Sequence, residues 1–410
     1  MIANRFDSTN EKDPVMPMGL ERSEKLEIAL SRMENESIDA ARTREAGKFE
    51  EFAAPFGKTL VLFGAGPLGK NTLAGLRRAG VEPLAFADNN PQLWGKDVDG
   101  LKVLPPDEVC SRYGDSACFV VTIYNGSAVR RQLAASGCKR VAPFPALFWK
   151  YPQVFTHTTG IDLPHRLHNA AAEIRLCDSI LCDEASRREL REQLVWRYWL
   201  DYDALPPPSD GKHTYFAPDL ATPRNDEVFV DCGSFDGDSL SSFATHWNGR
   251  FRHAFAFEAD PANRAALASN IDKMGLAERT TIMPYAVGNL TGPVSFACNG
   301  TAGSHVSSSG GASTVEARKL DDVQWPFPPT YIKMDIESAE PEALIGAQQL
   351  LRRYHPILAI CTYHRSEHLW QIPNLIHSIS TDYRIFIRRY AEECWEGVCY
   401  AIPSQRLKKA

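Results

Sequence analysis

The sequence predicts an α/β protein built from two sheet-containing domains. Short apolar runs with the length of buried strands alternate with helical stretches, first in residues 56–150 and again in residues 211–410. Alternation of this kind is typical of doubly wound, mostly parallel sheets. At 410 residues the chain is also too long for a single hydrophobic core. Residues 1–55 are expected to form a polar segment and a helix, and residues 151–210 a helical bridge between the domains.

Seven of the apolar runs lie in the C-terminal domain and predict a seven-stranded sheet. They are residues 228–232, 253–257, a run that ends before Tyr285, 331–333, 357–361, 383–387 and 397–402. Helical stretches separate the early runs, which favours parallel pairing. The last two runs have only a short connection, so we expect them to pair antiparallel, because a parallel crossover needs about a dozen residues.

The end of the first of these strands has the features of a cofactor-binding turn. Apolar residues lead into Asp231 and then into a loop with Gly233 and Gly237. Glycine lets a ligand approach the backbone closely, and Glu258 at the end of the second strand suits the two hydroxyls of a ribose. This domain has no G-x-G-x-x-G and no phosphate-binding lysine motif. The expected cofactor therefore has a ribose but no phosphate, as S-adenosylmethionine (SAM) does, with Ala286 placed to line its adenine.

Titratable side chains follow the fourth and fifth strands. Asp335, Glu337 and Glu340 crowd the end of the fourth strand, and His364 follows the fifth. Adjacent strand tips should bring them together. An imidazole with a near-neutral pKa suits a general base for a hydroxyl acceptor. The carboxylates of Asp335 and Glu337 could orient that hydroxyl or hold a divalent metal. We therefore assign His364, Asp335 and Glu337 to catalysis, with Asp335 and Glu337 as the candidate metal ligands.

Several ordered blocks in residues 214–403 resemble the FkbM-type family of SAM-dependent methyltransferases. The blocks are Tyr215 with Phe216, EVFVDCGSFDGDS at 227–239, FEADP at 257–261, IKMDIESAE at 332–340, Tyr363 with His364, LWQIP at 369–373 and YAIP at 400–403. The resemblance implies a SAM-dependent methyltransferase domain. Together with the carboxylate–histidine cluster it implies O-methylation of a hydroxyl on a sugar, glycan or related small molecule.

The chain departs from this family at Ser338, where a glycine usually follows the D-x-E of the fourth block. The turn there is the part of the pattern that the resemblance does not cover. Ser338 is also the feature that favours the alternative function, a scaffold protein that binds a nucleotide sugar or NAD and has an inactive methyltransferase domain.

The N-terminal domain carries its own glycine motif and is expected to be Rossmann-like. A strand ending at residue 63 meets Gly64, Gly66 and Gly69 in a G-x-G-x-x-G that opens a helix, and Asp88 ends the next strand. Taken literally, the motif predicts NAD binding. The following residues, 88–103, resemble the N-terminal domains of sugar-modifying glycan-pathway proteins, which implies a nucleotide-sugar site. A domain that binds nothing and positions its neighbour is the third interpretation.

The remaining segments predict connections. Residues 22–52 have helical spacing and should pack on another element or on a partner chain, so a homo-oligomer remains open. A helical run at 163–202 should fold back as two helices, with a break near Cys182, before the prolines at 206–208 stop it. Its aromatic residues are expected in an interface core. Residues 299–316, rich in small side chains, form either a lid or a surface excursion.

Composition excludes several classes of protein. The net charge of −6 and the lack of a basic run before the last residues argue against nucleic acid as a partner. No stretch reaches the roughly 18 apolar residues of a membrane span, and no signal peptide is recognisable. The ten scattered cysteines are expected to be reduced thiols. We therefore expect a cytoplasmic protein whose partner is a small-molecule or glycan substrate.

Overall fold

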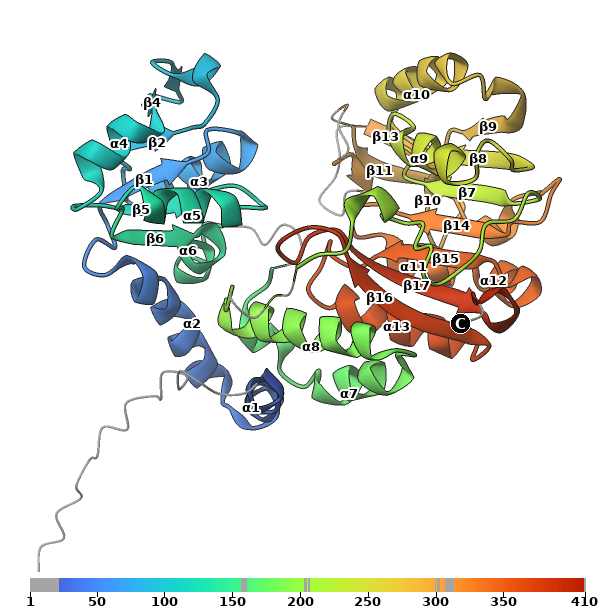
Figure 1. Ribbon diagram of the computed structural model, residues 1–410, viewed down its shortest axis with the longest axis horizontal. Coiled ribbons are helices and arrows are strands. Elements are labelled where there is room, and N and C mark those ends of the chain that lie inside the picture. Colours follow the sequence, from blue (N-terminus) through green and yellow to red (C-terminus); the bar gives the residue numbers. More distant parts are fainter. Residues whose placement is uncertain are drawn as a thin grey trace, which may run out of the picture.

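The computed structural model of the protein describes residues 22–155, 161–202, 205, 207–298, 300, 303–306 and 313–408, with side chains from Glu24 onward. Figure 1 shows two α/β domains side by side, with helices beneath them that join one to the other. The polar segment expected at the start of the chain lies outside the described residues, and so does Pro206.

The C-terminal domain contains the expected seven-stranded sheet, in the order β16-β17-β15-β14-β7-β8-β9. Its strands are β7 (Val228–Cys232), β8 (His253–Phe257), β9 (Thr280–Met283), β14 (Tyr331–Met334), β15 (Ile357–Cys361), β16 (Tyr383–Arg389) and β17 (Gly397–Pro403). Strands β9, β8, β7, β14 and β15 pair in parallel, and β17 pairs antiparallel with β15 and β16. Both the strand count and the antiparallel end are thus confirmed.

Helices cover this sheet, and a second, smaller sheet extends it. The helices are α9 (Asp238–His246), α10 (Pro261–Lys273), α11 (Glu340–Ile345), α12 (Gln348–Tyr354) and α13 (His368–Ile379). The second sheet has the order β10-β13-β11-β12 and was not anticipated. Its strands are β10 (Ala286–Val287), β11 (Gly292–Ala297), β12 (His305–Val306) and β13 (Ser313–Arg318). The described parts of the 299–316 segment include β12 and the start of β13, so this segment is in part a sheet.

The N-terminal domain is a second α/β unit, with a sheet in the order β3-β4-β2-β1-β5-β6. Its strands are β1 (Leu60–Phe63), β2 (Ala85–Ala87), β3 (Asp97–Val98), β4 (Leu101–Leu104), β5 (Cys118–Val121) and β6 (Arg140–Pro143). Its helices are α3 (Pro67–Arg78), α4 (Pro106–Tyr113), α5 (Ser127–Ala135) and α6 (Phe144–Lys150). The two strands that the sequence analysis placed around the glycine motif, one ending at residue 63 and one before Asp88, are present as β1 and β2. The β3–β4 hairpin was missed because its strands are short and half-exposed.

Two helix pairs form the connection between the domains. They are α1 (Arg22–Asn35) with α2 (Ile38–Ala53), and α7 (Ala171–Ile180) with α8 (Glu184–Trp199). The break expected near Cys182 is confirmed, because Asp183 caps the start of α8 with a bond from Ser186 N–H to its Oδ1. The single helix expected at 22–52 is instead two helices, since Ser37 caps α2. Helix α8 ends before the prolines, at Leu200 in a left-handed conformation.

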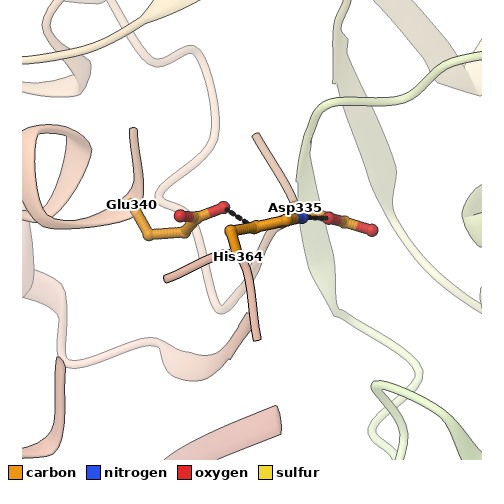
Figure 2. Close-up of side chains that lie close together, drawn as sticks. All are labelled: Asp335, Glu340 and His364. Atoms are coloured by element: carbon orange, nitrogen blue, oxygen red, sulfur yellow. Dashed lines mark hydrogen bonds and ion pairs between the residues drawn. The ribbon is translucent and has the colours of Figure 1, made fainter. Parts of the chain in front are cut away.

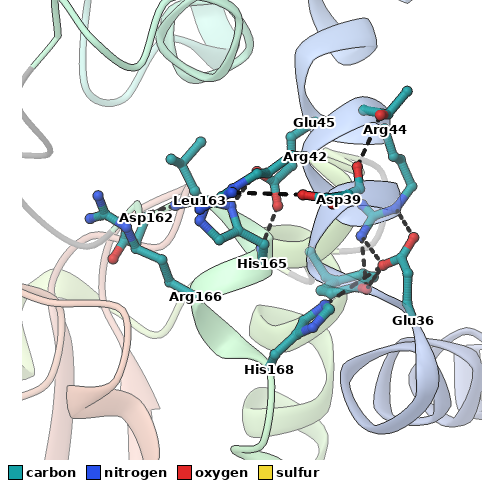
Figure 3. A network of polar contacts seen from close by, with 12 residues as sticks. Glu36, Asp39, Arg42, Arg44, Glu45, Asp162, Leu163, His165, Arg166 and His168 are labelled. Atoms are coloured by element: carbon teal, nitrogen blue, oxygen red, sulfur yellow. Dashed lines mark hydrogen bonds and ion pairs between the residues drawn. The ribbon is translucent and has the colours of Figure 1, made fainter.

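Polar contacts fasten α2 to the short 3₁₀ helix at Pro164–Leu167 (Figure 3). Buried Glu45 accepts from Nδ1 of His165 at 2.8 Å and also contacts the backbone N–H of that residue. On the same helix Arg44 pairs with Glu36 at 2.9 Å and donates to the hydroxyl of Tyr198 on α8 at 2.8 Å. The N-terminal helices are therefore fixed against the bridge from two sides.

The aromatic residues of α8 belong to the cores of both domains, as an interface core should. Trp196 is fully buried in the N-terminal cluster with Leu60 and Trp149. Two positions on, Tyr198 is buried in the C-terminal cluster with Ile360. One helix therefore joins the two hydrophobic cores, which makes the domain arrangement a packed one.

We expect Gly69→Ala to destabilise the N-terminal domain. A Cβ at Gly69 would lie 1.9 Å from the carbonyl oxygen of Gly64, so the helix or the strand must shift. Overpacking of this kind costs about 1–3 kcal/mol of unfolding free energy, measurable by urea denaturation. The control is Gly47→Ala in α2, where nothing lies within 4 Å of the new methyl. That change should stabilise by about 0.5–1 kcal/mol; equal effects of the two changes would contradict the packing argument.

Candidate functional site

A pocket opens at the carboxyl ends of β7, β8 and β14, the edge at which open α/β sheets bind ligands. Its lining residues are Gly233, Phe235, Phe257, Glu258, Ala259, Asn263, Tyr285, Ala286, Val287, Phe296, Ser304, His305, Asp335, Ile336, Glu337 and Ala339. Among the residues expected at the site, Gly233, Glu258, Ala286, Asp335 and Glu337 are therefore brought together. The described part of the 299–316 segment contributes Ser304 and His305 to the wall.

Glu258 lies between two backbone turns at the pocket wall. Its Oε2 accepts from the N–H of Phe235 at 2.9 Å and its Oε1 from the N–H of Asp260 at 2.8 Å. Burial raises the pKa of this carboxyl above its ordinary value, although both backbone bonds lower it. Each carboxylate oxygen has a second lone pair. Glu258 is therefore rigidly oriented and can still accept from a ligand hydroxyl.

Asp231 and Gly237, both expected on the cofactor, do not line the pocket. Asp231 is buried beneath it, with Oδ1 3.1 Å from Nζ of Lys333 on the neighbouring strand. The same ammonium donates to the carbonyl of Gly233 at 2.8 Å. Burial works against the charge on Lys333, but Asp231 and Asp335 outweigh it and raise its pKa. Asp231 thus holds the turn that forms the pocket floor, and Gly237 begins α9 in a left-handed conformation.

Figure 2 shows His364 clamped between two carboxylates. Its Nδ1 lies 2.8 Å from Oε1 of Glu340, and its Nε2 lies 3.1 Å from Oδ1 of Asp335. Glu337 is farther away, at 3.9 Å from Nε2. The expected proximity of His364 to Asp335 is found. Glu340, which the sequence analysis placed in the same acidic group without a role of its own, is the second partner of the ring.

This clamp corrects the protonation state expected for His364. Burial opposes a charge on the ring, but Glu340 and Asp335 outweigh it and raise the pKa of His364 well above its usual range. Both ring nitrogens then carry protons: Nδ1 donates to Glu340, and Nε2 forms an ion pair with Asp335. An imidazolium has no lone pair with which to accept a proton. His364 is therefore not the neutral base that the sequence analysis expected, and its role is to neutralise and orient Asp335 and Glu340.

The candidate metal ligands in the structure differ from those that the sequence predicted. Oxygen or nitrogen atoms of Asp335, Glu340 and His364 lie within 4.8 Å of one another, a spacing that could surround an ion. Glu337, expected as a ligand, is not in this group. The imidazolium already neutralises the two carboxylates that such an ion would need. Metal binding stays a prediction, with Glu340 and His364 in place of Glu337.

Two tyrosines that the sequence analysis gave no role meet at Asp335. Tyr215 donates its hydroxyl to Oδ2 at 2.8 Å, and the hydroxyl of Tyr363 lies 3.3 Å from Oδ1. Burial raises the pKa of both phenols well above the usual value, so both stay protonated donors. Burial also opposes the charge on Asp335, but His364 and Lys333 outweigh it and lower its pKa. Both tyrosines stand in the family blocks, which was the available signal.

The turn after β14 accounts for the departure at Ser338. Glu337 and Ser338 have φ values of 53° and 84°, in the left-handed region that favours glycine. The N–H of Ile336 donates to Oε1 of Glu340 at 2.9 Å and so closes the turn. The chain thus forms this turn with serine where the family has glycine. A left-handed residue other than glycine costs about 1–2 kcal/mol, which the buried ion pairs around it offset.

The glycine motif of the N-terminal domain lies at the end of β1, as expected. Gly64 has φ of 112°, and Gly69 packs α3 against its carbonyl, while Gly66 faces open space. Asp88, however, already accepts from the N–H of Ala65 at 2.9 Å. The acid therefore braces the glycine loop. Nucleotide binding at Gly64, Gly66, Gly69 and Asp88 stays a prediction.

We expect His364→Gln to remove a pH-dependent stabilisation. The folded-state pKa of His364 is raised, so its stabilisation is complete below the unfolded value of about 6.5 and is lost as pH rises through the folded value. Leaving buried carboxylates unpaired costs about 3–5 kcal/mol. Urea midpoints from pH 6 to 10 should therefore show a large deficit at pH 6 that shrinks at high pH. His377→Gln, a half-buried histidine of α13 outside the cluster, is the control. Parallel curves for wild type and His364→Gln would contradict the clamp.

Comparisons with known proteins agree with this geometry. Residues 231–392 match the family model described as the methyltransferase FkbM domain. The fold matches the crystal structure of methyltransferase FkbM from Methylobacillus flagellatus KT with a TM-score of 0.72 and 21% identity, covering 93% of this chain and 99% of that chain. A comparison with curated proteins finds no match.

Two further structures share smaller parts of the fold. An rRNA methylase from Streptococcus thermophilus has 11% identity and a TM-score of 0.32, over 47% of this chain and 93% of that chain. UDP-D-quinovosamine 4-dehydrogenase from Vibrio fischeri has 21% identity and a TM-score of 0.18, over 21% of this chain and 76% of that chain. Neither carries weight for function. No helix in the described part of the chain has the length and apolar character of a membrane span.

The resemblance inferred from the sequence blocks is thus confirmed, and with it the α/β fold. The likeness to the Methylobacillus protein extends through the N-terminal domain and the bridge, because it covers nearly the whole of both chains. Residues 231–392 match the methyltransferase FkbM domain, and this match indicates methyl transfer as the reaction class of that part of the chain.

Proposed function

We propose that the protein transfers the methyl group of SAM to a hydroxyl of a sugar, glycan or related small molecule. The observation that carries the proposal is one pocket lined by two unlike sets of residues. One set is Glu258 with apolar side chains, and the other is Asp335 with Glu337. The match to the FkbM methyltransferase domain supplies the reaction class, and the two sets suit a nucleoside cofactor and a hydroxyl acceptor.

The pocket fits SAM by its chemistry. Phe257, Tyr285 and Val287 give an apolar wall for a purine. Glu258, already oriented by two backbone donors, can accept from the ribose hydroxyls. Asp335 and Glu337 add negative charge to the lining, which suits a sulfonium cation. SAM supplies, when bound, an activated methyl group on that sulfur.

The residues around Asp335 suit the acceptor side of such a reaction. Methyl transfer needs the acceptor oxygen aligned with the methyl carbon, and alignment alone can contribute about 7–11 kcal/mol in the best cases. Asp335 stays ionised because His364 and Lys333 lower its pKa, so it can accept a hydrogen bond from a hydroxyl and fix its direction. The same low pKa makes Asp335 a weak base. Its role in this proposal is orientation.

The scaffold alternative receives little support from the site. Ser338, the feature that favoured it, adopts the left-handed turn of a glycine and leaves the pocket intact. The N-terminal domain could still bind a nucleotide sugar and present its sugar to the methyltransferase domain, which would unite the two interpretations. Titration calorimetry of the whole protein with NAD and with UDP-sugars shows which of these ligands, if either, the N-terminal domain binds.

We expect S-adenosylhomocysteine to bind, and Glu258→Gln to weaken it. Replacing a charged acceptor by a neutral one removes about 1.5–3 kcal/mol, or roughly tenfold to a hundredfold in affinity. Titration calorimetry measures this directly. Glu316→Gln on β13, an exposed glutamate outside the pocket, should leave affinity unchanged. No heat with wild type, or equal affinity for Glu258→Gln, would contradict the assignment of the cofactor site.

We expect the transferred methyl group on oxygen. Radiolabelled SAM with a panel of monosaccharides, oligosaccharides and sugar nucleotides should give a labelled product, because the residues around Asp335 suit a hydroxyl that needs alignment. NMR of the product distinguishes O-methyl from N-methyl and C-methyl carbons by chemical shift. A methyl group found on nitrogen or carbon would refute O-methylation while leaving SAM binding intact.

A further inference from the structure

The loop between β16 and β17, residues 390–396, touches both domains. The N–H of Tyr390 donates to the carbonyl of Glu396 at 3.1 Å and closes the loop at its base. Buried Arg389 supports it from below, because its guanidinium contacts the carbonyls of Ala391 and Glu393. Glu189 of α8 holds that arginine through Nε at 2.7 Å. These contacts therefore hold the loop in one conformation.

The outer side of this loop is bound by the N-terminal domain. Buried Glu393 pairs with Arg130 of α5 at 2.7 Å. Trp395 donates from Nε1 to the carbonyl of Tyr124 at 2.6 Å, and the two rings stack edge to face at 4.9 Å. Cys394 and Trp395 belong to the hydrophobic core that the N-terminal sheet forms. The position of the loop thus depends on the N-terminal domain.

The inner side of the loop runs beside the end of β15, next to the Asp335 cluster. Strands β15 and β17 pair with Cys361 opposite Val398, and the N–H of Thr362 donates to the carbonyl of Gly397 at 2.8 Å. Continued beyond the paired strands, this register brings Tyr363 opposite Glu396. The hydroxyl of Tyr363 lies 3.3 Å from Oδ1 of Asp335, so the loop approaches the Asp335 cluster at this point.

The backbone of Glu396 is fixed, while its carboxylate has no bonding partner among the described residues. It has φ of 56°, which fixes the loop in a left-handed bend just before β17. Within the described residues, its half-buried side chain has no hydrogen bond or ion pair. The groups whose charges act on it are Asp335, His364, Lys333 and Asp238. Its own charge in turn acts on Tyr215, Cys361 and Tyr363. Burial, and then Asp335, raise the pKa of this carboxyl to about 7.

We propose that Glu396 is the base that takes the proton of the acceptor hydroxyl, and that the N-terminal domain positions it through Glu393 and Trp395. The proposal rests on the proposed function. In the step, the acceptor oxygen forms a bond to the methyl carbon while the bond from that carbon to sulfur breaks. The sulfur keeps the electron pair and leaves as a neutral thioether. The hydroxyl proton moves to a carboxylate oxygen of Glu396 and then to water.

The other groups at this site are less suited to the task. Both ring nitrogens of His364 already face carboxylates, and the hydroxyls of Tyr215 and Tyr363 are directed at Asp335. Asp335 already receives hydrogen bonds from Tyr215 and Tyr363 and an ion pair from His364. Glu396 differs from the other described carboxylates near Asp335, because it belongs to the 390–396 loop, which contacts both domains.

The test uses sinefungin, a SAM analogue with an amine-bearing carbon where SAM has its methylsulfonium. Its ammonium lies where the methyl group would be transferred, so a carboxylate base there should bind it. We expect Glu396→Gln to weaken sinefungin binding about tenfold and to leave S-adenosylhomocysteine within about twofold, by calorimetry. Glu392→Gln, on the same loop but exposed and paired with Arg131, should change neither affinity.

The positioning part has its own variant. Glu393→Gln keeps the shape of the side chain but weakens the pair with Arg130. It should lower sinefungin affinity at least about threefold, again without affecting S-adenosylhomocysteine. General destabilisation of the protein would lower the affinity for both ligands, so a loss of affinity for sinefungin alone points to positioning. On the acceptor found by label transfer, Glu396→Gln should also lower kcat by about 10² or more, the usual size of base assistance.

The outcomes separate the claims. If wild type bound neither nucleoside, the proposed function would be wrong, and the role of Glu396 with it. If wild type bound both and Glu396→Gln left their affinity ratio unchanged, the role of Glu396 alone would be overturned. If Glu396→Gln changed the ratio and Glu393→Gln did not, Glu396 would stand and positioning by the N-terminal domain would be rejected.

Discussion

A row of alternating charges buried at the tips of β7, β14 and β15 holds the site together. Asp231 pairs with Lys333 at 3.1 Å, Asp335 pairs with His364 at 3.1 Å, and His364 pairs with Glu340 at 2.8 Å. Lys333 also acts on Asp335 and so joins the two halves of the row. Removing any one charge would leave a buried neighbour unpaired, which is far more costly than an exposed pair. The turn at 336–340 and the pocket floor at Gly233 both take their positions from this row.

The charge balance of the row limits the chemistry beside it. Two cations, Lys333 and His364, face three carboxylates, and Glu337 adds another carboxylate at the rim. Such a site favours a cationic cofactor and disfavours a free alkoxide, which would be a like charge next to Asp335. A hydroxyl acceptor therefore cannot easily lose its proton before methyl transfer. Proton removal has to accompany bond formation, which requires a base within reach of the oxygen.

The sequence was sufficient for what depends on local patterns. Apolar runs predicted the seven strands, and strand-tip adjacency predicted that Asp335 meets His364. The sequence placed Glu340 in this acidic group but gave it no role, because its contact with the ring depends on a turn with two left-handed residues, which the sequence pattern does not show. The expected roles of Asp231 and of His364 as a base rested on residue type and on position at a strand tip. Asp231 is buried next to Lys333, which keeps it away from the pocket. His364 is buried between two carboxylates, which decides its protonation. Both environments are formed by the tertiary structure.

The N-terminal domain was also visible in the sequence, but its attachment was not. Nothing local in residues 390–396 predicts that Trp395 packs into a core more than two hundred residues earlier in the chain. That core includes Trp196 and Leu200 of the bridge as well as Cys394 and Trp395 of the methyltransferase domain. Deleting the N-terminal domain would expose these side chains to water, at about 25 cal/mol for each Å² of apolar surface. Lost activity in such a truncation would therefore reflect a damaged domain as much as a missing function. Single substitutions within the loop that both domains share keep the two cores intact, and so they can separate positioning from folding.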